Sequence, residues 1–306
     1  MNLSVNFCGI NFPNPTVVAS GYLGVTGASL ANCVRSGAGG VTGKTLFMDE
    51  RPGHPNPTVI TFPGGLINAV GLCGEGIKNA RHEFEKYRDL APENPIIGSI
   101  GGKNIDELVE VARIMQEYPV DMLELNFSCP NVDDEMGWPI ACDAQLTAKA
   151  TQAIRKVVKK PISVKLSPNV PNIALIARHA EEAGANAITA VNTMGPGMLI
   201  DIKMRRPILA NKVGGVSGQA LFPIALRCVY DVYKAVKIPI IATGGIIKGQ
   251  DAIAMLMAGG SLLGIGSAIA SYDLACFDML NEKIQEFMKE EGFSDISELV
   301  GLAHQN

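Results

Sequence analysis

A cysteine stands between a serine and a proline in the stretch LNFSCPN, residues 125–131, where an apolar run gives way to polar residues. A free cysteine is most often a small buried residue without reactivity. Its thiol has a pKa of about 8.5, and a nearby positive charge lowers that pKa until the thiolate can act as a proton acceptor. Cys129 is therefore a candidate base or nucleophile, with inert packing as the alternative.

Two lysines also end apolar runs, Lys44 in GGVTGKT and Lys165 in SVKLSP. Either lysine alone could simply extend from a strand end into water. Together with nearby asparagines they favour a pocket for a planar anionic ligand, because asparagine both donates and accepts hydrogen bonds while lysine supplies positive charge. These asparagines are Asn68, Asn126, Asn131 and Asn192.

Two glycine-rich stretches, TGG at 243–245 and GIGS at 264–267, follow the last two apolar runs and precede helical patterns. The backbone N–H groups of such turns, with the positive end of a helix dipole, bind anions. A single glycine turn is unremarkable, but a pair after the last two strands of a barrel indicates a phosphate site.

The elements that must position these residues are short apolar runs alternating with segments of helical periodicity. Such alternation predicts a parallel sheet covered by helices, and about eight units favour a (β/α)8 TIM barrel over an open doubly wound sheet. Asn104, followed by Glu107, predicts the start of one helix. The expected strands lie within 15–20, 39–45, 95–102, 121–128, 161–168, 187–194, 238–245 and 261–268.

In a barrel the carboxyl ends of all strands converge on one mouth, where the active site lies. The polar residues described above fall at these strand ends, so we expect them to share one site. Two segments, 46–74 and 195–219, exceed an ordinary strand-to-helix loop and are expected to extend over the mouth. No low-complexity linker divides the chain, and residues 1–306 are expected to form a single domain.

Composition narrows the classes of partner. A formal net charge of −4 argues against nucleic acid as a ligand. The N-terminal stretch has no basic leader with an apolar core, and no apolar run is long enough to cross a membrane, so a cytoplasmic protein without a membrane segment is expected. The seven cysteines are scattered without CxxC spacing, and the four histidines show no HxxxH pairing. No metal site is therefore expected.

Motifs along almost the whole chain resemble those of the dihydroorotate dehydrogenases. They are GKT at 43–45, NAVGL at 68–72, NFSCPN at 126–131, KLSP at 165–168, NT at 192–193, GGVSG at 214–218, ATGGI at 242–246 and GIGSA at 264–268. The resemblance implies a (β/α)8 barrel that carries FMN and oxidises dihydroorotate to orotate in pyrimidine (UMP) biosynthesis.

The cysteine resembles the base of the class 1 enzymes, since the membrane-bound class 2 has serine there and an N-terminal extension. The stretch 201–240 is similar to subclass 1B. That subclass implies a partner subunit that carries FAD and a 2Fe-2S cluster and passes electrons to NAD. It also implies a heterotetramer of two catalytic and two electron-transfer subunits around a homodimer of catalytic chains.

The resemblance implies a role for each matching residue. Cys129 would take the C5 proton of dihydroorotate while hydride leaves C6 for N5 of FMN. Lys165 would stabilise the anionic reduced flavin near its N1 edge. The substrate would be held by Lys44, Asn68, Ala69, Val70, Gly71, Leu72, Asn126, Asn131, Asn192 and Thr193. FMN would be held by Ser20, Lys44, Thr45, Ser99, Asn126, Lys165, Val191, Gly218, Gly244, Gly245, Gly266 and Ser267, the last four around its phosphate.

Three other functions remain open at this point. The chain could be a fumarate-linked class 1A enzyme, which is a homodimer without the electron-transfer subunit. It could be another FMN barrel that acts on dihydropyrimidines lacking the carboxylate of orotate. It could also be a barrel subunit that binds a phosphorylated ligand without catalysis.

Overall fold

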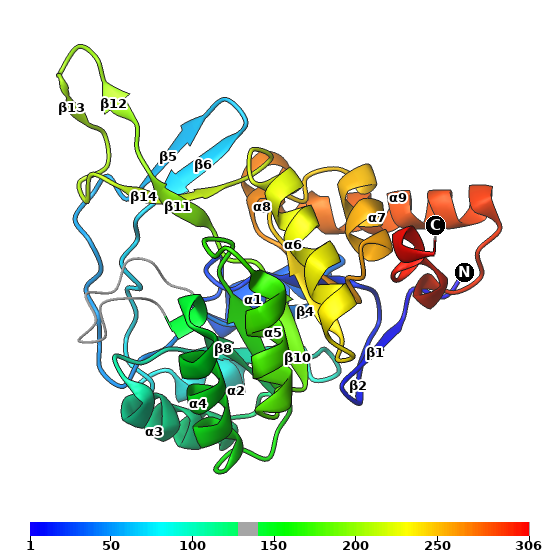
Figure 1. Cartoon of the computed structure of the whole chain (residues 1–306), viewed down its shortest axis with the longest axis horizontal. Coiled ribbons are helices and arrows are strands. Elements are labelled where there is room, and N and C mark those ends of the chain that lie inside the picture. The colour runs from blue at the N-terminus through cyan, green and yellow to red at the C-terminus, as the bar shows by residue number, and fades with distance from the viewer. Residues whose placement is uncertain (128–139, 306) are drawn as a thin grey trace.

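A closed barrel of parallel strands forms the centre of the molecule in the computed structural model, which describes residues 1–127 and 140–305 (Figure 1). Around the barrel the strand order is β10-β15-β16-β3-β4-β7-β8-β9. The strands are β3 (Thr16–Val18), β4 (Gly40–Thr42), β7 (Ile96–Ile100), β8 (Met122–Asn126), β9 (Ile162–Leu166), β10 (Ala187–Ala190), β15 (Ile240–Thr243) and β16 (Leu262–Ile265). Each of the expected runs contains one of these strands, so the predicted TIM barrel is confirmed.

Helices cover the outside of the barrel. They are α1 (Gly27–Arg35), α2 (Arg81–Leu90), α3 (Ile105–Gln116), α4 (Ala144–Arg155), α5 (Ile173–Glu182), α6 (Phe222–Ala235), α7 (Gly249–Met257), α8 (Ser267–Tyr272) and α9 (Cys276–Glu291). Asn104 caps α3 as predicted, because its side chain accepts a hydrogen bond from the Glu107 N–H at 2.9 Å. The Glu107 carboxylate accepts from the Lys103 N–H at 3.1 Å, which fixes the turn before the helix. Of the described helices, none is both long and apolar enough to cross a membrane.

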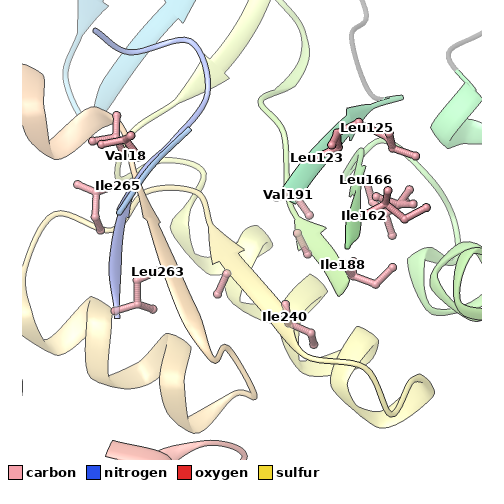
Figure 2. Packing of buried hydrophobic residues seen from close by; sticks show 14 of the residues in the cluster. Val18, Leu123, Leu125, Ile162, Leu166, Ile188, Val191, Ile240, Leu263 and Ile265 are labelled. Atoms are coloured by element: carbon pink, nitrogen blue, oxygen red, sulfur yellow. The ribbon is translucent and has the colours of Figure 1, made fainter. Parts of the chain in front are cut away.

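Alternation along each strand gives the barrel two different faces. Side chains at every second position point outward and pack against the helices, as Leu123 and Leu125 of β8 do in Figure 2. The same outer layer contains Val18, Ile188, Ile240 and Leu263 from other strands. The remaining positions of each strand point into the barrel.

The inward positions nearest the strand starts are apolar and are covered by an N-terminal hairpin. Strands β1 (Val5–Phe7) and β2 (Ile10–Phe12) pair antiparallel and insert Phe7 and Phe12 against this layer. The two rings meet edge to face with centroids 6.2 Å apart. This hairpin, which closes one end of the barrel, was not among the elements predicted from the sequence. The inward residues that it covers are Val17, Ile97, Met122, Ala187, Ile241 and Leu262.

The opposite end carries a second sheet built from both long segments. Strands β5 (Val59–Phe62) and β6 (Gly65–Asn68) come from 46–74, while β11 (Met194–Gly197) and β14 (Gly214–Ser217) come from 195–219 and the residue before it. They form one antiparallel sheet in the order β11-β14-β6-β5. Between β11 and β14 lies a hairpin of β12 (Ile200–Asp201) and β13 (Arg206–Pro207), which projects away from the helices in Figure 1. The two long segments that were expected to be loops therefore pair with each other as strands of one sheet.

Replacing Phe12 by Ala tests how much the hairpin contributes to stability. The side chain is fully buried in the end layer of the barrel, and removing a buried phenylalanine ring costs about 3–5 kcal/mol. We expect the free energy of unfolding in urea to fall by that amount. Asn11→Ala, at an exposed position of the same strand, is the matched control and should change it by less than about 0.5 kcal/mol. Equal effects of the two substitutions would contradict the structural role of the ring.

Candidate active site

Two adjoining cavities open at the carboxyl ends of the barrel strands. The larger has a volume of about 300 Å³ and the smaller about 70 Å³. Both are bordered by Ser20, Tyr22, Lys165, Asn192 and Thr193, so they form one continuous site.

Most of the predicted site residues border one of these cavities. Those at the larger cavity are Ser20, Lys44, Thr45, Asn68, Val70, Gly71, Leu72, Asn126, Lys165, Asn192 and Thr193. Val191, Gly244, Gly245, Gly266 and Ser267 border the smaller cavity. The convergence expected from strand ends is thus present in the fold.

Three predicted residues border neither cavity, and two more lie outside the described residues. Ser99 is fully buried below the cavity floor, and Ala69 packs in a small apolar cluster of the second sheet. Gly218 follows β14 and borders neither cavity. Cys129 and Asn131 lie outside the described residues, so their predicted roles stay predictions.

Hydroxyl groups from three strand ends form a network under the larger cavity. Thr45 Oγ1 lies 3.2 Å from Ser20 Oγ and 2.9 Å from Ser99 Oγ. The Asn126 side-chain amide donates to Thr45 Oγ1 at 3.1 Å. Since these residues follow β3 and β4 or lie in β7 and β8, the network ties neighbouring strand ends together and orients the Asn126 amide.

An ion pair lies beside this network inside the barrel. Lys165 Nζ lies 3.7 Å from Glu124 Oε1, and the Ser99 hydroxyl donates to the same oxygen at 3.4 Å. The exposed fractions of Lys165 and Glu124 are only 5% and 2%. The lysine therefore reaches the cavity from a closely packed polar interior and does not extend into bulk water.

The second sheet places a wall over the larger cavity. Val59 and Leu66 contribute apolar side chains to this wall, and Asn68 adds an amide at the end of β6. Asn68 Nδ2 donates to the Gly215 carbonyl of β14 at 3.4 Å, and the two residues face each other in the sheet register. The pairing of the two long segments thus sets the position of residues 68–72 above the cavity.

The smaller cavity is lined by backbone at the ends of β15 and β16. Gly244 and Gly245 have φ of +125° and +75°, which disfavours any residue with a side chain. A Cβ atom on Gly245 would lie 2.5 Å from the Gly218 carbonyl oxygen, so the turn has no room for one. Thr243 donates to the Gly264 carbonyl at 2.8 Å and holds the two strand ends together.

Some polar residues at or beside the site were not singled out from the sequence, among them Tyr22, Ser217 and Glu124. Tyr22 and Ser217 border both cavities, and burial raises the pKa of the Tyr22 phenol while a hydrogen bond with Ser217 partly offsets that rise. Tyr22 lies two residues after Ser20 at a strand end, which was a usable signal. Glu124 carried a clearer one, because it is a charged residue within the apolar strand MLELN.

The donors of the site fit a phosphorylated ligand with a planar ring. The smaller cavity is about the size of a phosphate group and is lined by glycine backbone, the arrangement that binds phosphate at helix starts. The larger cavity offers two lysines and several amides, which complement carboxylate and imide groups. The site therefore suits a phosphate group in the smaller cavity beside planar carboxylate or imide groups in the larger one.

Comparisons with known proteins agree with this geometry. The family model described as dihydroorotate dehydrogenase matches residues 2–288. A protein of Methanothermobacter thermautotrophicus is 43% identical over 302 residues, covering 99% of this chain and 98% of its own. Relatives from Methanocaldococcus jannaschii and Pyrococcus furiosus are 42% and 40% identical over 305 residues, covering 99% and 100% of this chain and 98% and 100% of their own.

All three relatives are named dihydroorotate dehydrogenase B (NAD(+)), catalytic subunit. The stretch 201–240 is similar to the NAD-linked subclass, and these relatives of that subclass match the chain along nearly its full length. With a family match over most of the sequence and identities near 40%, the chain belongs to the dihydroorotate dehydrogenase family.

Proposed function

We propose that this protein is the catalytic subunit of an NAD-linked dihydroorotate dehydrogenase, which oxidises dihydroorotate to orotate with bound FMN. One observation carries the proposal: a phosphate-sized glycine cavity opens directly into a larger cavity that holds two lysines and several amides. A flavin phosphate suits the first cavity, and a flavin ring beside a pyrimidine carboxylate suits the second.

FMN would be held mainly from the strand ends of the barrel. Its phosphate would accept hydrogen bonds from the backbone of the two glycine-rich turns at 244–245 and 266–267. Lys165 would place positive charge near the ring, which stabilises the negative charge gained on reduction. FMN, when bound, supplies a hydride acceptor that no protein side chain provides. The further FMN ligands are Ser20, Lys44, Thr45, Ser99, Asn126, Val191 and Gly218.

Dihydroorotate would lie between the flavin and the second sheet. Its carboxylate would pair with Lys44, and its imide would exchange hydrogen bonds with asparagine amides, which donate and accept together. Cys129 would remove the C5 proton as the hydride leaves C6, so the C5–C6 bond becomes double and orotate is formed. The substrate ligands are Lys44, Asn68, Ala69, Val70, Gly71, Leu72, Asn126, Asn131, Asn192 and Thr193.

A partner subunit completes the proposed electron path. The relatives named above are catalytic subunits of NAD-linked enzymes, and that name supports a separate subunit for reaction with NAD. The partner would carry FAD and a 2Fe-2S cluster and assemble with this chain as a heterotetramer of two catalytic and two electron-transfer subunits. A homodimer of catalytic chains would form its core.

The visible spectrum of the anaerobic purified chain tests the proposal. We expect a yellow protein whose flavin absorbance bleaches when dihydroorotate is added, because substrate oxidation reduces FMN. Yellow protein that does not bleach would reject dihydroorotate as substrate, and dihydrouracil should then be tried. Colourless protein that FMN cannot reconstitute would reject the flavoenzyme.

The same sample identifies the acceptor. Added NAD should restore the yellow colour slowly in the isolated chain, because the proposed path to NAD runs through the partner. Rapid reoxidation by NAD without a second subunit would contradict the need for that partner. Rapid reoxidation by fumarate would instead place the chain with the homodimeric class 1A enzymes.

Gly245→Ala tests the proposed phosphate cavity. The added methyl group would meet the Gly218 carbonyl at a backbone conformation that already disfavours it, so the turn must shift. We expect FMN affinity, measured by quenching of flavin fluorescence, to fall at least about tenfold, equivalent to about 1.4 kcal/mol. Gly292→Ala is the matched control, since Gly292 has φ of +79° but nothing within 4 Å of the new methyl group. Equal losses would attribute the effect to backbone strain alone.

Cys129→Ser tests the proposed base. A hydroxyl is a far weaker proton acceptor than a thiolate near neutral pH, so the rate of flavin reduction by dihydroorotate should fall by a factor of about 100 or more. The pH dependence of that rate should move to higher pH, as measured by anaerobic stopped-flow absorbance. Cys142→Ser, at a half-buried free cysteine in the described part of the chain, is the control and should leave the rate within about twofold. An unchanged pH profile in Cys129→Ser would mean that a different group takes the proton.

A further inference from the structure

Glu124 is a buried carboxylate that has no part in the proposed chemistry. It lies in β8 between Leu123 and Leu125, both of which face the helices, so its side chain points into the barrel. Met122 precedes it in the apolar end layer, and Asn126 follows it at the cavity. The carboxylate therefore lies one step below the cavity floor.

Its surroundings couple Glu124 to residues of the site. The register places it opposite Ser99 of β7 and Ser163 of β9, while Lys165 lies two residues beyond Ser163. Its Oε1 atom accepts from the Ser99 hydroxyl at 3.4 Å and lies 3.7 Å from Lys165 Nζ. Ser99 continues the contact to Thr45, whose hydroxyl accepts from the Asn126 amide.

Packing alone does not require a charge at this position. A buried ion pair loses much of its Coulomb attraction to desolvation, and an apolar pair of similar volume is often at least as stable. A buried ion pair at this position is therefore better explained by a role at the cavity than by a gain in stability. Here the lysine reaches the cavity while its counter-ion stays below it, so the pair places a partly balanced positive charge at the floor.

We propose that Glu124 is a positioning residue for Lys165 and that its negative charge lowers the reduction potential of the bound flavin. The inference rests on the proposed placement of FMN above Lys165. Reduction adds negative charge to the flavin ring, and a lone lysine would favour that charge more strongly than a lysine paired with a carboxylate. The pair thus keeps the reduced flavin able to pass its electrons onward.

The test is the midpoint potential of FMN in the purified full-length chain, titrated electrochemically without dihydroorotate. In Glu124→Gln the side-chain shape and the contact to Ser99 are kept while the negative charge is lost. We expect the equilibrium to shift at least about tenfold toward reduced flavin, which for a two-electron couple is a positive shift of about 30 mV. An unchanged potential would overturn the inference.

Asp121→Asn is the matched control because it removes the same charge just before the start of the same strand. Its carboxylate pairs with Arg88 at 2.5 Å and lies at the end of β8 away from the cavities. This variant should leave the flavin potential unchanged. A shift equal to that of Glu124→Gln would show a general effect of net charge and would overturn the positioning role.

A second comparison covers the case in which Glu124→Gln retains no flavin. Lys165→Gln leaves the Glu124 carboxylate without its lysine partner. The double variant Lys165→Gln/Glu124→Gln lacks that negative charge as well, so its flavin should have a higher midpoint potential than the flavin of Lys165→Gln alone. Equal potentials would overturn the inference. Failure of dihydroorotate to bleach the wild-type flavin would reject the proposed substrate only, whereas a wild-type chain that binds no FMN would overturn the inference together with the proposed cofactor.

Discussion

Closure of the parallel sheet into a barrel is the constraint on which the rest of the structure depends. A closed sheet has no free edges, so its inner and outer faces are fixed by the two-residue alternation of each strand. All strands run in the same direction, which brings their carboxyl ends to one mouth. Lys44, Asn126, Lys165 and Asn192 are far apart in the sequence, yet this single geometric condition makes them neighbours at one cavity.

The inner face changes from apolar to polar along the barrel axis. Strand β8 shows the change over three inward positions, with Met122 in the end layer, Glu124 above it and Asn126 at the cavity. The apolar end is closed by Phe7 and Phe12 of the N-terminal hairpin, which keeps water from that side. Glu124 and Lys165 in the middle layer are buried, and the effect of a buried charge on a ligand is stronger than that of a charge at a surface.

Local sequence signals predicted the barrel and most of the site, because each strand is a short apolar run and the polar residues follow directly after it. Nearly all predicted residues of the described chain border the cavities for this reason. The second sheet could not be predicted in this way. Its strands β6 and β14 are paired across about 150 residues, and their short sequences, GLIN and GGVS, lack the usual alternation of apolar and polar residues. The hairpin that carries Phe7 and Phe12 could not be predicted locally either, because its side chains are buried by contact with strands from distant parts of the chain.

The second sheet also explains how one site can hold two ligands in fixed relation. Asn68, which borders the larger cavity, and Ser217, which borders both cavities, belong to paired strands of the same sheet. The turn before β6 packs against the end of β14, since the Ala220 N–H donates to the Gly64 carbonyl at 2.8 Å. Movement of either strand would displace both sides of the cavity together. The spacing of the two proposed ligands is therefore set by the covering sheet as well as by the barrel, and hydride transfer depends on that spacing.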